Sequence, residues 1–184
     1  MPVVHNAMML IKPSSVNVTG VGSSATINDS GSVTFSSCES LSLNNVFSSV
    51  FDNYVVYLRH RDDGTTSIRL RRNSADDSTA SSYTYQLLDA QSTTVAGARS
   101  TSTLAPAAYG ASTSPNGNTL YIFGPALNQP TAGRSVNVNN IGSARLTDWA
   151  WTHNQSVSYD GFTLLRTSTA QTMHGDISVY GLRQ

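Results

Sequence analysis

The chain has little of what enzymes and metal proteins use for chemistry. Only 12% of its 184 residues are charged, and it contains one cysteine, one glutamate and four scattered histidines. Cys38 alone can form neither an intrachain disulfide nor a cysteine-rich metal cluster. The sequence has no phosphate loop, dinucleotide fingerprint, calcium loop or Gly-x-Ser-x-Gly motif. We therefore expect no catalytic site, no cofactor and no metal, although two distant aspartates could still meet in space as a glycosidase pair.

The chain also lacks a net charge and a long apolar run. Its formal net charge is zero and its pI about 6.9, so no bulk field attracts nucleic acid or an anionic membrane. The apolar segment 8–11 is too short to cross a bilayer, and no basic segment precedes it as in a signal peptide. We expect a protein that neither inserts into membranes nor binds nucleic acid.

What the sequence has instead is alternation of apolar and polar residues in short segments. Gly, Asn and Asp residues separate these segments, as turns require. Period-two alternation predicts strands, and about eleven or twelve of them without a confident helix predict an all-β, antiparallel sandwich or barrel. The expected strands cover residues 15–18, 25–27, 32–35, 41–43, 54–61, 68–71, 83–88, 120–123, 135–139, 144–153, 162–164 and 177–181.

We expect one sandwich domain over residues 14–184, preceded by an extended N-terminal arm over residues 1–13. Pro13 disfavours helix in the residue before it, so the arm should enter the first strand extended. Its apolar residues need cover, and we interpret them as a contact with another subunit or with a capsid. These residues are Met8, Met9, Leu10 and Ile11.

The segment 53–72 has the pattern of a β-hairpin with one buried face. Apolar residues alternate with polar ones on both sides of Asp63-Gly64, a common turn sequence. A three-residue loop containing Gly64 keeps the two dry faces together and sets Arg59 opposite Arg69. Like charges directly opposite are unfavourable, so this face should receive a counter-charge from another strand, another subunit or a ligand.

Arginines concentrate in the same segment. Two interpretations stay open, a subunit interface and an internal salt-bridge ladder with Asp62, Asp63, Asp76 or Asp77. Phosphate binding is disfavoured by the neutral charge of the chain. Asp76 and Asp77 could otherwise be solvated or hold a cation. The arginines that we assign to the candidate interface are Arg59, Arg61, Arg69 and Arg71.

Trp149 and Trp151 stand two apart on an expected strand and so project to one face. If exposed, they form a stacking platform for sugar rings, together with the long Ser/Thr/Ala/Gly-rich segment 90–118, which we expect to be a loop. If buried, they belong to the core or to an interface.

Several segments resemble a family of small β-sandwich proteins of tailed-bacteriophage virions. The segments are Val33-Thr34-Phe35 through Leu43-Asn44-Asn45-Val46-Phe47 into Phe51-Asp52-Asn53-Tyr54, Tyr121-Ile122-Phe123-Gly124-Pro125-Ala126 through Gln129-Pro130, and Tyr159-Asp160-Gly161-Phe162-Thr163-Leu164 with Ser178-Val179-Tyr180-Gly181-Leu182. The resemblance implies a jelly-roll-like module on the virion exterior, commonly a trimer, as a capsid decoration, head fibre or tail-fibre component. Its partners would be a major capsid or tail protein.

We therefore expect a non-enzymatic structural protein that decorates the capsid surface, or forms a head fibre, as a trimer. The alternative is a tail-fibre or receptor-binding module that recognises a host surface glycan through Trp149 and Trp151.

Overall fold

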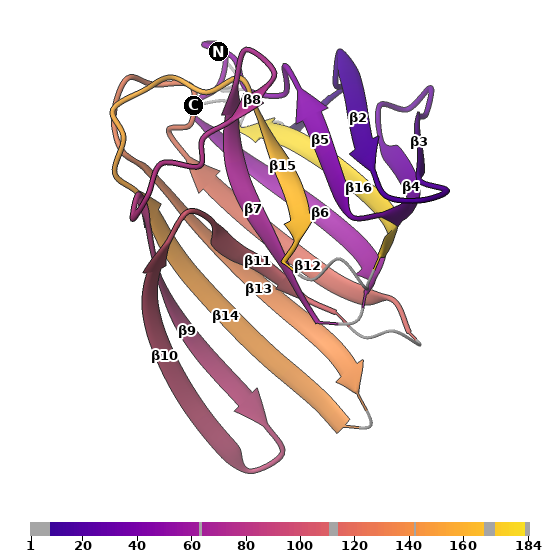
Figure 1. Ribbon diagram of the computed structural model, residues 1–184, viewed down its shortest axis with the longest axis vertical. Coiled ribbons are helices and arrows are strands. Elements are labelled where there is room, and N and C mark those ends of the chain that lie inside the picture. Colours follow the sequence, from indigo (N-terminus) through magenta and orange to yellow (C-terminus); the bar gives the residue numbers. More distant parts are fainter. Residues whose placement is uncertain (1–7, 63, 111–113, 142, 168–171, 183–184) are drawn as a thin grey trace, which may run out of the picture.

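The computed structural model describes residues 8–62, 64–110, 114–141, 143–167 and 172–182, and these residues form two antiparallel sheets without a helix. The sheets lie face to face, with the smaller in front of the larger in Figure 1. The all-β sandwich expected from the sequence is thus confirmed.

The larger sheet has ten strands in the order β10-β9-β14-β13-β12-β6-β16-β4-β3, and β1 pairs with β16. Its strands are β1 (Met8–Ile11), β3 (Ser24–Ile27), β4 (Val33–Cys38), β6 (Asn53–Arg61), β9 (Tyr83–Gln91), β10 (Thr94–Ser102), β12 (Asn116–Phe123), β13 (Thr131–Ile141), β14 (Ser143–His153) and β16 (Met173–Leu182). The smaller sheet has six strands in the order β11-β7-β15-β5-β2, with β8 paired to β7. They are β2 (Ser15–Thr19), β5 (Ser40–Asn44), β7 (Thr65–Arg72), β8 (Ala75–Asp76), β11 (Ala105–Tyr109) and β15 (Gly161–Arg166).

The core lies between the sheets and follows from the alternation. Every second side chain of β6 points inward, and the corresponding side chains of β7 and β15 meet them. Each fully buried aliphatic or aromatic side chain contributes roughly 1.5–3 kcal/mol. The largest of these fully buried core side chains are Tyr54, Tyr83, Tyr159, Phe162, Leu41, Leu43, Leu58, Ile68, Leu70, Leu120, Ile122 and Leu164.

The predicted hairpin over residues 53–72 is wrong. β6 pairs with β12 and β16 in the larger sheet, whereas β7 pairs with β11 and β15 in the smaller one. The chain therefore crosses between sheets near Gly64. Alternation does not distinguish a hairpin from such a crossing, because both leave one face of each strand dry. Arg59 lies opposite Asp176 and Gly117, not opposite Arg69.

Buried Asp62 anchors this crossing. Arg166 Nη1 lies 2.7 Å from its Oδ2, and Thr66 Oγ1 donates to the same carboxylate. Gly110 packs directly on Asp62, and a Cβ at that glycine would overlap the carboxylate. Asp62, which the sequence offers as a counter-charge for the arginines of segment 53–72, thus makes a buried ionic contact between the two sheets, with Arg166 as its partner.

The expected loop over residues 90–118 is also wrong, because it contains β10, β11 and the start of β12. β10 is exposed along almost its whole length, so it has no alternation to detect. β11 is largely built of small buried residues, Ala105, Ala107 and Ala108, which carry little hydrophobic signal. These strands and two short ones raise the number of strands among the described residues to sixteen.

The described part of the N-terminal arm belongs to the larger sheet. Met8 pairs with Leu182 and Ile11 with Val179 at the end of β16. The segment is extended, as expected, but it continues its own sheet. Residues 1–7 of the predicted arm lie outside the described residues.

Candidate interaction surface

The ten-stranded sheet has one face turned away from the smaller sheet, which we call the outer face. Nine of the twelve large apolar side chains that are exposed in the described chain lie on it, and the other three are Met9, Val21 and Val50. Alternation and strand register place each of the nine on this side. They are Met8, Leu10, Tyr57, Leu88, Val95, Tyr121, Phe123, Val138 and Leu146.

The half of the outer face nearest the chain ends is aromatic. Tyr121 and Phe123 on β12 stack with centroids 6.4 Å apart, and Tyr57 on β6 meets Tyr180 on β16 edge-on at 5.6 Å. Val55 lies between Tyr121 and Tyr180 in register and is only 3% exposed, although it points outward. The aromatic side chains thus form a packed layer that resembles a core but is covered only from the side of the sheet.

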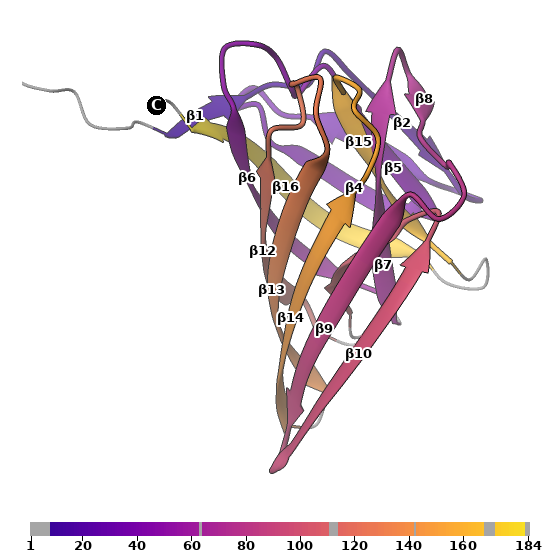
Figure 2. The same cartoon turned by 90° about the vertical axis from the view of Figure 1, so that its left-hand side faces the viewer.

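The other half of the outer face is aliphatic. Val138 on β13, Leu146 on β14, Leu88 on β9 and Val95 on β10 extend it towards the tip of the β9–β10 hairpin. This hairpin reaches beyond the rest of the molecule in both views (Figures 1 and 2). The apolar surface therefore runs across most of the sheet.

Charges on the outer face are few and partly neutralised. Arg134 on β13 and Asp148 on β14 form a two-point ion pair, with contacts of 3.0 and 2.5 Å. Arg59 and Arg61 on β6 are exposed on this face and form no ion pair with a described carboxylate. Two of the arginines assigned to an interface by sequence thus share a face with Met8 and Leu10.

A shallow groove lies beside Arg59 on the outer face. Its volume is about 320 Å³, and Gly117 leaves open space above the sheet. The hydroxyl of Thr34 donates to Asp176 at 2.7 Å, which holds that carboxylate at the groove edge. The lining residues are Tyr57, Leu58, Arg59, Gly117, Asn118, Thr119, Asp176 and Ser178.

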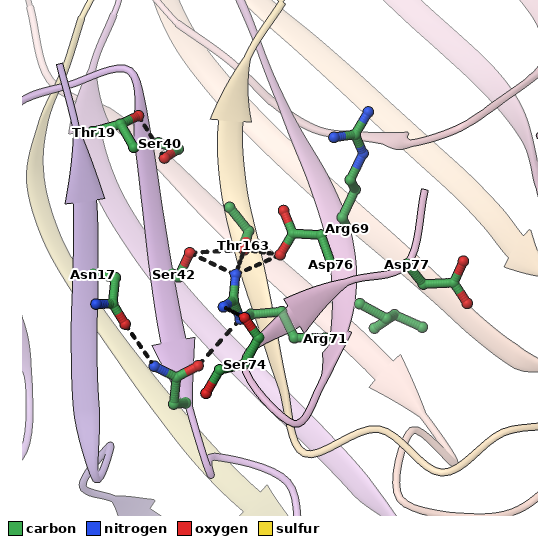
Figure 3. Close-up of polar contacts among 12 residues, drawn as sticks. Asn17, Thr19, Ser40, Ser42, Arg69, Arg71, Ser74, Asp76, Asp77 and Thr163 are labelled. Carbon is green, nitrogen blue, oxygen red and sulfur yellow. Dashed lines mark hydrogen bonds and ion pairs between the residues drawn. The ribbon is translucent and has the colours of Figure 1, made fainter. Parts of the chain in front are cut away.

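Arg69 and Arg71 lie elsewhere, on the far face of the smaller sheet. Arg69 Nε donates to the carbonyl of Thr103 at 3.1 Å. Arg71 is buried and lies across β15 towards β5 (Figure 3). Its guanidinium contacts Asn44 Oδ1 at 3.1 Å, Ser42 Oγ at 2.8 Å, Thr163 Oγ1 at 2.7 Å, Asp76 Oδ1 at 2.5 Å and the carbonyl of Ser74.

This network assigns one arginine of the cluster to an internal salt bridge. Arg71 has its counter-charge within the chain, in Asp76, as an internal salt bridge. Arg59 and Arg61 keep the interface interpretation, because they remain exposed. The assignment of Arg69 and Arg71 to the same interface as Arg59 is not supported, since crossing between sheets puts them on opposite sides of the sandwich.

Trp149 and Trp151 point into the sandwich and are 7% and 3% exposed. Trp151 packs beside Gly133, where an added Cβ would lie 2.2 Å from Cζ2 of the indole. Trp149 meets Tyr85 edge-on at 5.8 Å. They are core residues and offer no stacking platform, so the glycan role assigned to them from sequence is wrong.

Buried titratable groups are engaged in structural contacts. His153 Nε2 lies 2.6 Å from Tyr159 Oη and 3.1 Å from Asp77 Oδ2, and Tyr159 donates to the same carboxylate at 2.5 Å. Burial lowers the pKa of His153 despite the neighbouring carboxylate. Burial would raise the pKa of Asp77, but hydrogen bonds from Tyr159 and Thr79 outweigh it and lower the pKa to about 2.

Sequence reasoning found Met8, Leu10, Arg59 and Arg61 but missed most of the outer face. Met9 and Ile11 project to the other side of β1. The apolar run over residues 120–123 does indicate this surface, because a continuous apolar strand is typically covered on both faces. The chain itself buries only Leu120 and Ile122 on one face and leaves Tyr121 and Phe123 exposed on the other.

Among the described residues, no three His, Cys, Asp or Glu side chains gather as a metal site. None of the described segments is a helix that could cross a membrane. No protein-family model matches the chain, and no curated protein matches it.

Proposed function

We propose that this protein is a non-enzymatic structural component of a bacteriophage virion, located on the exterior and associated as a trimer. It decorates the capsid, or forms a head fibre, through protein–protein contacts. The observation that carries the contact role is the concentration of nine exposed apolar side chains on the outer face of the larger sheet. The virion assignment rests on the resemblance described from the sequence, including its jelly-roll-like character.

The outer face is large enough for a stable interface. The sheet is nine strands wide, because β1 and β4 follow one another along the same side of β16. Nine strands at about 4.8 Å spacing span roughly 40 Å, and five residues of a strand span roughly 17 Å, which gives about 700 Å². This is close to the roughly 800 Å² that one partner buries in a standard interface.

The packing of the aromatic half also favours a permanent partner. Tyr121 stacks on Phe123 and Tyr57 packs on Tyr180, yet Tyr121, Phe123 and Tyr57 are each more than a third exposed. Aromatic side chains are enriched at the centres of protein interfaces. Arg134 lies opposite Tyr121 and is paired with Asp148, so this charge is already neutralised within the chain.

Location is tested by labelling purified particles with an antibody to the protein, or by cryo-electron microscopy of particles with and without it. We expect copies on the exterior of the head, arranged in threes. A protein present only in infected-cell lysate and absent from particles would overturn the virion proposal. Attachment is tested by removing residues 1–7, which leaves β1 in its sheet.

A second candidate is receptor-glycan binding by a tail-fibre module. The groove beside Gly117 favours it, because exposed Tyr57 lies next to Arg59 and Asp176 and so places an aromatic ring beside planar polar groups. A glycan array tests this candidate, with Tyr57→Ala and Gly117→Val as variants that should remove binding. The absence of any bound glycan would dismiss it.

A further inference from the structure

The edges of the two sheets differ in how well they are protected. β1 and β3 have four residues each, β2 has five and β8 has two, so each offers few backbone groups to another strand. β11 carries Pro106, and its pairing with β7 is interrupted after that proline. Short length, proline and irregularity are the usual protections of an edge strand.

β10 has none of these protections. It contains nine residues and pairs with β9 in unbroken register from Thr94 to Ser102, and no strand of the described chain lies on its other side. Its side chains are small except for Val95 and Arg99, and it contains no proline or lysine. The long regular edge therefore presents free backbone donors and acceptors in the geometry that a further strand requires.

We propose that β10 pairs antiparallel with β10 of a second copy of the chain, so that two ten-stranded sheets become one continuous sheet. A partner strand should also be a long, unprotected edge. Among the described edge strands, only β10 itself meets this condition, so β10 of a second copy is the matching partner. An antiparallel pair of identical strands is self-complementary about a two-fold axis. The pairing also continues the apolar outer face, because Val95 of each copy lies at the junction.

Full overlap of nine residues places the two-fold axis at Ala98. Gln91 and Thr94 are joined by a two-residue connection. The backbone N–H and C=O groups of β10 that point away from β9 therefore belong to Val95, Gly97, Arg99 and Thr101. With the axis at Ala98, Gly97 lies opposite Arg99 of the other copy. The charge then faces a glycine, and the two arginines are not directly opposed.

Two-fold pairing goes beyond the proposed trimer. A contact about a two-fold axis cannot close a ring of three copies, so β10 links copies that belong to different trimers. On a surface that carries many copies, such pairs would join neighbouring trimers into a network. This last step rests on the proposed function, whereas the strand pairing itself does not.

Cysteine cross-linking tests the pairing with a matched control. Ala98→Cys places two thiols at a directly opposed position, within the roughly 7 Å between Cα atoms that a disulfide permits. Ala96→Cys is exposed on the same side of β10, but its symmetry mate lies four residues along, about 14 Å away. Native Cys38 is buried and gives a low background.

Under mild oxidation we expect Ala98→Cys to form a disulfide-linked dimer at least tenfold faster than Ala96→Cys, and Gly97→Arg in the same chain to abolish the link by opposing Arg99. The link should persist when Tyr121→Ser and Phe123→Ser disrupt the outer face, so its failure is distinguishable from failure of the trimer. Equal cross-linking of both cysteine variants, or none for either, would overturn the pairing.

Discussion

The guanidinium of Arg71 lies 2.5 Å from the carboxylate of Asp76 over the far face of the smaller sheet. Both side chains also contact Thr163, so strands β7, β8 and β15 meet in one polar cluster (Figure 3). The arginine side chain is 8% exposed, which leaves little water to replace a missing partner.

Arg71→Leu should lower the free energy of unfolding by about 1.5–3 kcal/mol, because Ser42, Asn44 and Thr163 lose a buried cationic hydrogen-bond partner, whereas the Asp76 side chain is 25% exposed and can be hydrated. The measurement is urea unfolding followed by tryptophan fluorescence. Arg72→Leu is the matched control, since Arg72 is exposed and adjacent, and it should change stability by less than about 0.5 kcal/mol. Equal effects of the two substitutions would contradict the network.

Gly133→Ala should destabilise the protein by about 1–3 kcal/mol, because the added Cβ overlaps the indole of Trp151 and forces the core to shift. Gly117→Ala on the neighbouring strand is the control, since nothing lies within 4 Å of its Cβ position. Thermal unfolding of the two variants decides the matter. A Gly133→Ala protein as stable as Gly117→Ala would show that Trp151 does not pack as described.

Acid should destabilise the fold through Asp77. Its pKa of about 2 lies below the ordinary 3.8, so the unfolded chain takes up this proton first as the pH falls. The contribution of Asp77 to the free energy of unfolding should therefore be complete above pH 4 and decline between pH 4 and 2. Denaturant titrations across that range should give a shallower decline for Asp77→Asn. An unchanged slope would exclude Asp77 as the source.

The sequence was sufficient for the fold class and for most strands with one wet and one dry face, such as β6 and β14. It was insufficient for strand pairing, because the dry face of β6 meets β7 across the core and not beside it in a sheet. Strands without alternating polar and apolar residues are not predicted from the sequence either. Exposed β10 and alanine-rich β11 have no alternation, so only tertiary contacts reveal them.

The candidate surface shows the same limit. Arg59 and Arg71 are indistinguishable by pattern, yet one is exposed on the outer face and the other is buried in a hydrogen-bond network. Trp149 and Trp151 were placed on one side of their strand correctly, but alternation does not say which side faces the core. The outer face emerges only when strand pairing places Tyr57, Tyr121 and Val138 on the same side of three neighbouring strands.

The mass of the protein in solution tests the central claim, that the outer face of the larger sheet is a contact surface. In a Gly97→Arg chain, where β10 pairing is blocked, sedimentation equilibrium should give three times the 19.6 kDa of one chain. Adding Tyr121→Ser and Phe123→Ser should reduce it to a single chain, whereas Val21→Ser, on a side chain 97% exposed outside this face, should not. A single-chain mass without the serine substitutions, or a trimer that survives them, would contradict the account.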